Sequence, residues 1–138
     1  MRYVIDASVA VKWYIPEIYE QEATRLLNGR HQLHVPELIL PEIGSIVWKN
    51  VRRGCLTSDE GKDIVAAVGR KRWTIHPHKQ SFRSAFSGAE ATGQTVYDWT
   101  YLALAMSLTC ELVTADEKFY KALETTSFSG NLKWIGRF

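Results

Sequence analysis

The chain has 138 residues, of which 46% are hydrophobic and 23% charged, with a formal net charge of +2. This composition is typical of one globular domain with a substantial core, residues 1–138, and excludes a disordered chain. The small positive charge does not by itself indicate a nucleic-acid partner. No apolar run is long enough to span a membrane, and Asp6 interrupts the first run before a signal peptide can form, so we expect a soluble, cytoplasmic protein.

Short apolar runs alternate with longer helical patterns along the chain. We expect strands at Arg2–Asp6, Leu33–Val35, Trp73–His76, Glu111–Thr114 and Leu132–Ile135. Strands that are separated by helices predict a parallel sheet with helices on both faces. The expected fold class is therefore α/β, with three α/β/α layers and a central parallel sheet of about five strands.

Helices are expected between these strands. Pro16 predicts the start of one helix and Gly29 its end, while Pro36 predicts the start of the next, which ends near Gly54. Thr57 begins a capping box and therefore a further helix. The last three helices are expected at Gln80–Ala91, after Thr95 and from Asp116.

Four acidic residues occupy positions where charge is costly. Asp6 and Asp116 follow apolar strands, whereas Glu42 and Asp98 lie on or beside the apolar stripes of two predicted helices. A buried carboxylate needs a compensating partner, and a divalent metal is the simplest one here. The carboxyl ends of neighbouring parallel strands share one crevice, in which the four side chains can meet. Oxygen ligands without His or Cys match Mg²⁺ or Mn²⁺, and paired ions of this kind promote displacement at phosphorus.

Each acid also has a purely structural interpretation. Asp6 and Asp116 can be turn or helix-cap residues, and the helix dipole favours Asp98 in a first turn. Glu42 is similarly ambiguous when it is considered alone. The metal-site hypothesis therefore depends on the combination of the four acids, which is far more specific than any single member.

The motifs around these acids resemble those of the PIN-domain nucleases. The motifs are Asp6-Ala7-Ser8 after the first strand, Pro41-Glu42-Ile43 in a helix, Tyr97-Asp98 at a helix start and Thr114-Ala115-Asp116 after a later strand. Chain length and motif order are most similar to the VapC-type toxins of prokaryotic toxin–antitoxin pairs. The resemblance covers the chain from Arg2 to Ile135.

This resemblance implies a Mg²⁺- or Mn²⁺-dependent endoribonuclease that hydrolyses RNA, an antitoxin partner and, commonly, a homodimer. By position, the residues that match the family's catalytic and metal-binding acids are Asp6, Glu42, Asp98 and Asp116, and those that match supporting hydroxyls are Ser8 and Thr114. Some relatives add a fifth acid shortly after the last aspartate. Only Glu117 stands there, which leaves open whether one or two ions bind.

Three basic residues follow Glu42 on the same predicted helix. Lys49, Arg52 and Arg53 share one helix face, about two to three turns beyond Glu42. They are expected either to hold RNA phosphates or to form a solvated polar face.

Other functions account for less of this pattern. A PIN-like RNA-processing nuclease without an antitoxin stays an alternative. An aspartyl-phosphate phosphatase using Asp6 needs a second acid where Ser8 stands, and a phosphoacceptor or non-catalytic binding module leaves Glu42 without a role. The histidine spacing matches no zinc motif, and no glycine-rich phosphate loop is present.

Overall fold

The computed structural model describes all residues, 1–138, and has a five-stranded parallel sheet at its centre. The strand order is β3-β2-β1-β4-β5, and every neighbouring pair is parallel. The strands are β1 (Arg2–Ile5), β2 (Gln32–Pro36), β3 (Thr74–His76), β4 (Glu111–Thr114) and β5 (Leu132–Trp134). The expected strands and the expected fold class are confirmed.

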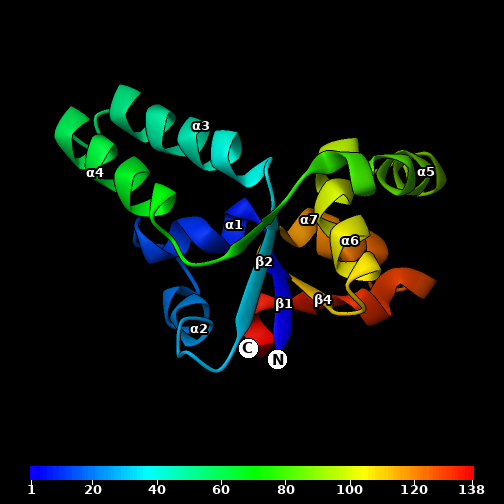
Figure 1. Cartoon of the computed structure of the whole chain (residues 1–138). Coiled ribbons are helices and arrows are strands. Elements are labelled where there is room, and N and C mark those ends of the chain that lie inside the picture. The colour runs from blue at the N-terminus through cyan, green and yellow to red at the C-terminus, as the bar shows by residue number, and fades with distance from the viewer.

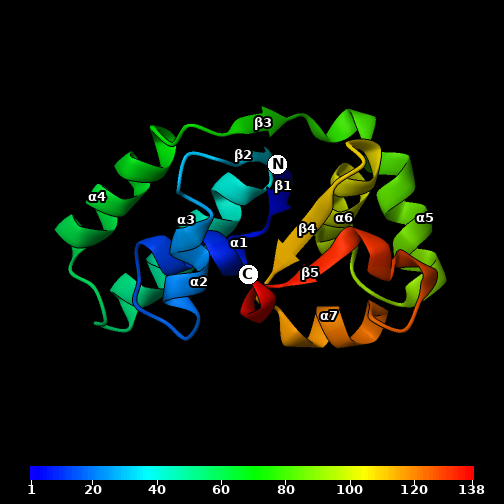
Figure 2. The same ribbon diagram turned by 90° about the horizontal axis from the view of Figure 1, so that it is seen from below.

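Helices cover both faces of this sheet. Figure 2 shows α1 to α4 on one side and α5 to α7 on the other, and α3 and α4 form a pair that projects away from the sheet (Figure 1). The helices are α1 (Ala7–Ala10), α2 (Glu20–Arg25), α3 (Ile39–Arg52), α4 (Ser58–Gly69), α5 (Phe82–Thr92), α6 (Val96–Ser107) and α7 (Glu117–Leu123). Short 3₁₀ segments are η1 (Val11–Trp13), η2 (His78–Gln80), η3 (Ser127–Asn131) and η4 (Ile135–Arg137). No helix has the length and apolar character that a membrane crossing requires.

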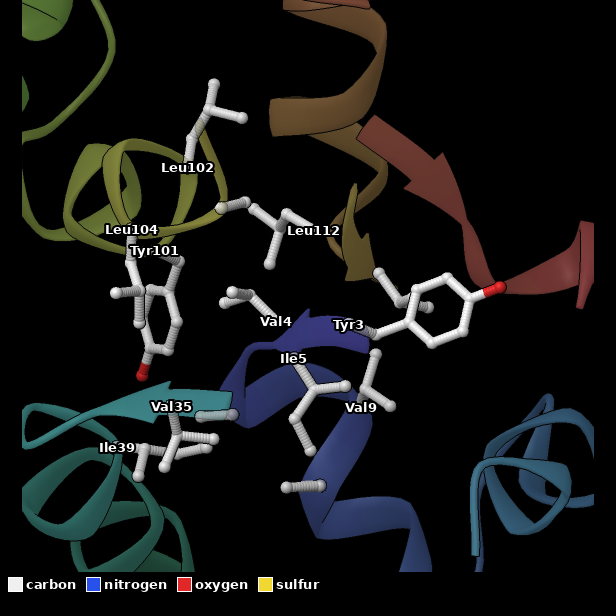
Figure 3. Close-up of a cluster of buried hydrophobic side chains, with 14 of the residues drawn as sticks. Tyr3, Val4, Ile5, Val9, Val35, Ile39, Tyr101, Leu102, Leu104 and Leu112 are labelled. Carbon is white, nitrogen blue, oxygen red and sulfur yellow. The ribbon is translucent and has the colours of Figure 1, made fainter. Parts of the chain in front are cut away.

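The core lies on both sides of β1. Figure 3 shows Val4 on the side of Leu112 and α6, whereas Ile5 lies on the opposite side, towards Val9 and Ile39. Val4 and Ile5 are both fully buried. Apolar residues at successive strand positions are what a sheet covered by helices on two faces requires.

The start of α3 differs from the expectation. Pro36 is the last residue of β2, and the helix begins three residues later at Ile39. Pro41 does not disturb the helix because the first turn has no intrahelical partner for its backbone N–H groups. Glu42 therefore stands in the first turn of α3.

The start of α2 also differs, whereas that of α4 agrees. The helix expected from Pro16 begins only at Glu20, because Tyr19 just before it has a left-handed backbone with φ of 67°. Thr57 and Glu60 form the expected capping box at the start of α4. Thus the capping motif located a helix end more accurately than proline did.

The strand order determines where functional side chains can gather. Ile5 at the end of β1 is paired with Val113, so the carboxyl ends of β1 and β4 lie side by side. A helix follows each strand almost at once, α1 after β1 and α7 after β4. The short links between these elements carry Asp6 and Asp116.

Candidate active site

Asp6 stands at the junction of β1 and α1 and receives three hydrogen bonds. As the N-cap of α1, its Oδ1 accepts a bond from the Val9 N–H at 3.2 Å. Ser8 Oγ donates to Oδ1 and Thr114 Oγ1 donates to Oδ2, both at 2.5 Å. Because Thr114 ends β4, this carboxylate connects two neighbouring strands.

Asp116 has the corresponding position after β4. It is the N-cap of α7, and its Oδ1 accepts a bond from a backbone N–H of the first turn at 3.1 Å. The Asp116 N–H donates to Thr114 Oγ1 at 3.1 Å, and the Ala115 N–H donates to Ser8 Oγ at 3.0 Å. The two hydroxyls therefore link Asp6 to the backbone that carries Asp116. Both aspartates are helix caps, and the charge of Asp116 also acts on Asp6, so the two interpretations of the sequence are compatible.

Glu42 and Asp98 approach this junction from the first turns of α3 and α6. Thr95 caps α6 and its Oγ1 accepts a bond from the Asp98 N–H at 3.1 Å. Both acids are half-buried. Burial raises the pKa of Asp98, the charge of Asp116 adds to the rise, and Thr95 and Lys118 lower it.

The pKa values of Asp6 and Glu42 indicate that the four acids act on one another electrostatically. Burial raises the pKa of Asp6 to about 6 although its hydrogen bonds lower it, and the charge of Asp116 adds to the rise. Burial also raises the pKa of Glu42 to about 7, with further contributions from the charges of Asp6 and Asp98. Each carboxylate thus lies within electrostatic range of at least one other at the carboxyl end of the sheet.

No basic side chain forms an ion pair with these four acids. The ion pairs in the structure are Lys12–Glu17 and Lys121–Glu117. No three acidic, histidine or cysteine side chains converge closely enough to hold an ion in this structure. The donors are partly buried oxygens, a chemistry that fits a hard divalent cation such as Mg²⁺ or Mn²⁺.

Tyr101 is a member of this site that the sequence did not reveal. Its side chain on α6 is buried, and its hydroxyl has no hydrogen bond that meets ordinary geometric criteria. The hydroxyl nevertheless lies close enough to Glu42 to lower the pKa of that carboxyl. Burial, followed by the charges of Glu42, Asp6 and Asp98, raises the pKa of Tyr101 well above its usual value. One feature of the sequence could have indicated this: Tyr101 comes three residues after Asp98, and this spacing places both side chains on one helix face.

Glu117 is engaged in an ion pair within α7. Its Oε1 pairs with Lys121 Nζ at 2.6 Å across one turn of α7, and both side chains are exposed. This pairing lowers the pKa of Glu117. In this structure Glu117 is therefore not the fifth acid of the cluster.

The three basic residues of α3 form no ion pair with the four acids. Lys49, Arg52 and Arg53 are exposed at the carboxyl end of the helix, and the Arg52 guanidinium lies 5.3 Å from the centre of the Trp48 ring. Their positions are about 10 to 17 Å from Glu42 along the helix axis. They can contact a long ligand that also reaches the acids, but they do not neutralise the acids directly.

The sequence and the fold match known proteins over nearly the whole chain. The family model described as the PIN domain matches residues 3–123. Ribonuclease VapC3 of Pyrobaculum aerophilum is 32% identical over 120 residues, which cover 86% of this chain and 92% of that protein.

Solved structures with the same fold include a toxin and a chain of a toxin–antitoxin complex. Mycobacterium tuberculosis VapC20, a sarcin–ricin loop cleaving toxin, matches with a TM-score of 0.67 and 14% identity, over 88% of this chain and 95% of that chain. A toxin–antitoxin complex from Klebsiella pneumoniae matches with a TM-score of 0.56 and 14% identity, over 88% and 92% of the two chains. At these identities the structural likeness shows the shared fold alone.

Proposed function

The chain belongs to the PIN-domain family, and we propose that it is a divalent-metal-dependent endoribonuclease that acts as the toxin of a type II toxin–antitoxin pair. The observation that carries this proposal is the group of four partly buried carboxylates without a basic partner at the carboxyl edge of the sheet. The proposed catalytic and metal-binding residues are Asp6, Glu42, Asp98 and Asp116. The similarity to a ribonuclease over most of both chains supports RNA as the substrate.

The residues of the site have different tasks in this proposal. Bound Mg²⁺ or Mn²⁺ supplies a Lewis acid that lowers the pKa of water and offsets negative charge at phosphorus. Asp6 offers oxygens whose positions Ser8 and Thr114 fix by hydrogen bonds. Glu42, with a pKa of about 7, is able to take up a proton near neutral pH. The nearby Tyr101 hydroxyl lowers the pKa of Glu42 and so favours its charged form.

The RNA strand is proposed to extend from the acids towards the end of α3. There the exposed residues Lys49, Arg52 and Arg53 hold its phosphates, which favours binding without selecting a base sequence. None of the three is used in an ion pair within the chain. Their availability supports this role.

The proposed partner is an antitoxin, by analogy with the toxin–antitoxin complex that shares the fold. A basic side chain of the antitoxin would compensate the acidic crevice in place of a metal ion and so block it. Trp13 and α3 are proposed to form the walls of its binding groove, and the toxin itself is proposed to be a homodimer. Co-purification with the product of an adjacent small gene tests this part; a solitary, non-toxic protein would favour an RNA-processing nuclease instead.

Incubation of the purified protein with cellular RNA tests the nuclease activity. We expect cleavage at defined positions with Mg²⁺ or Mn²⁺, none with a chelator, and none for Asp98→Asn. Asp63→Asn is the matched control, because Asp63 is an exposed acid on α4. Intact RNA with the wild-type protein in either metal, or cleavage by Asp98→Asn at the wild-type rate, would contradict the proposal.

A further inference from the structure

A groove of about 740 Å³ lies directly beside the acidic site. Its wall includes Ala115, the residue between Thr114 and Asp116, and Lys12, two residues after α1. Because the Ala115 N–H is bonded to Ser8 Oγ, one wall of the groove is also part of the Asp6 network. The volume is within the range of pockets that hold small organic groups, about 300 to 1,000 Å³.

Three aromatic side chains line this groove, and they come from distant parts of the chain. Tyr19 precedes α2, Tyr120 lies on α7 and Trp134 ends β5. The ring centres of Tyr19 and Trp134 are 5.7 Å apart, and those of Tyr120 and Trp134 are 5.5 Å apart. The Tyr19 ring meets Trp134 edge to face at 83° and the Tyr120 ring is tilted by 44° to it, so the three rings form a contiguous but not flat aromatic lining, called here the aromatic groove, with Trp134 in the middle.

The backbone is specialised to hold these rings in place. Tyr19 has a φ of 67°, a conformation that costs a residue other than glycine about 1–2 kcal/mol. Gly136 lies against Trp134, since a Cβ at this position would stand 2.8 Å from the indole nitrogen and 3.2 Å from the Tyr19 ring. The strained backbone of Tyr19 and the close packing of Gly136 thus both affect the same pair of rings, Tyr19 and Trp134. Local backbone strain of this kind is typical of functional sites.

Charged groups surround the aromatic surface. Lys12 is almost fully buried, and its Nζ donates to Glu17 Oε2 at 2.9 Å on the groove wall. Glu117, Lys121 and Glu124 lie on the α7 side. The Lys12–Glu17 and Glu117–Lys121 pairs still have donor hydrogens and acceptor lone pairs free for a ligand. A flat ligand with hydrogen-bonding edges fits this arrangement, because its face can meet a ring while its edges meet the charges.

We propose that the aromatic groove binds one unpaired nucleobase of the RNA, next to the phosphate that the acidic site cleaves. This inference rests on the proposed function and adds a subsite to it. Single-stranded RNA is recognised mainly through bases that stack on aromatic side chains. The base stacks on one ring of the group Trp134, Tyr19 and Tyr120 and meets the others with its edge, while Glu117, Glu124 and Lys121 contact the base edge and thereby influence the base preference. Lys12 has further donor hydrogens for the neighbouring phosphate.

Binding of short single-stranded RNA by the full chain, measured by fluorescence anisotropy in a chelator, tests the inference without cleavage. Tyr19→Gly removes the ring and relieves the left-handed strain, so this variant should fold at least as well as the wild type. We expect about tenfold weaker binding for Tyr19→Gly and Trp134→Ala, and nearly unchanged binding for Tyr19→Phe, which keeps the ring. Phe86→Ala is the control, because Phe86 is an exposed aromatic residue on α5 that does not line the groove.

Mapping of cleavage positions in Mn²⁺ provides the second measurement. The ring-removing variants should lose base preference at one nucleotide beside the cleaved bond while still cutting RNA. If wild-type protein cuts RNA but Tyr19→Gly and Trp134→Ala keep its affinity and base preference, the groove inference is wrong and the nuclease proposal stands. If wild-type protein fails to cut RNA, the nuclease proposal itself fails. Loss of peptide-partner binding with RNA binding intact would assign the groove to a protein and overturn the inference.

Discussion

The acidic site has two halves, which are held in different ways. In the half formed by β1 and β4, Asp6 receives three hydrogen bonds, and its pKa is raised to about 6 by burial. In the half formed by α3 and α6, Glu42 has only the nearby Tyr101 hydroxyl to offset burial, and its pKa is about 7. The strand half is thus organised by the protein itself, whereas the helix half needs a bound cation to be fully charged at neutral pH.

The largest expected effect is loss of cleavage on replacing one acid from either half. Asp6→Asn and Asp98→Asn should each slow RNA cleavage by about a hundredfold or more, because each removes charge that stabilises the reaction. Their stabilities should differ. Asp98→Asn relieves repulsion and leaves metal-free stability equal or higher, whereas Asp6→Asn places an amide donor among hydroxyl donors and lowers stability by about 1 kcal/mol.

Single-turnover cleavage and denaturant unfolding measure these two quantities separately. Equal losses of stability for Asp6→Asn and Asp98→Asn would remove the proposed difference between the two halves.

The next effect concerns the hydroxyl that joins β4 to Asp6. Thr114 is 1% exposed, donates to Asp6 and accepts a bond from the Asp116 N–H. Thr114→Val has nearly the same shape but no polar group, so we expect the free energy of unfolding to fall by about 1–3 kcal/mol. Thr114→Ser should keep most of the stability. A fully stable valine variant would show that the hydroxyl network does not organise the strand half.

The effect of pH should distinguish the halves further. The pKa of Glu42 is about 7 in the folded protein and 4.5 without the fold. Between these values the folded state keeps a proton that the unfolded state has lost, so metal-free stability should fall as the pH rises through this window. Asp6 contributes in the same direction, from 3.8 to about 6.

Thermal melts below, within and above this range provide the measurement. Glu42→Gln should flatten the upper part of the curve, and saturating Mn²⁺ should reverse its slope because protons compete with the metal. A wild-type melting temperature that rises with pH in the absence of metal would contradict the account.

The smallest expected effect lies outside both halves, at the end of α3. Arg52→Ala combined with Arg53→Ala should raise the Michaelis constant a few-fold and reduce the salt dependence of RNA binding by about one to two charges. The positions of cleavage should not change, because contacts to phosphate carry no base information. Lys79→Ala with Arg83→Ala removes the same charge from another exposed surface and is the control. Identical results for the two pairs would mean that α3 has no special phosphate contact.

Local sequence signals were sufficient for the sheet and most of the helix ends. Apolar runs predicted all five strands because buried parallel strands require them, and the Thr57 capping box marked α4 correctly. The start at Pro36 was wrong because proline is compatible with both a strand end and a helix start. The short helix α1 was missed because four residues are too few to show a helical period.

The acids of the site were predictable because charge stands out beside apolar runs, although their assignment as metal ligands stays a prediction. Tyr101 was not predictable, since a tyrosine within an apolar helix stripe is equally typical of a core residue. The aromatic groove could not be predicted from the sequence either. Tyr19, Tyr120 and Trp134 come together only through the packing of α2, α7 and β5.

Direct measurement of Mn²⁺ binding tests the central claim, that the two halves form one metal site. Electron paramagnetic resonance reports the free Mn²⁺ during a titration of the purified, metal-free protein. The account predicts that the wild type takes up Mn²⁺, that Asp6→Asn and Asp98→Asn each weaken binding by about tenfold or more, and that Asp63→Asn binds normally. Wild-type protein that leaves all Mn²⁺ free at millimolar concentration, or that binds it equally well without Asp6 and without Asp98, would contradict the account.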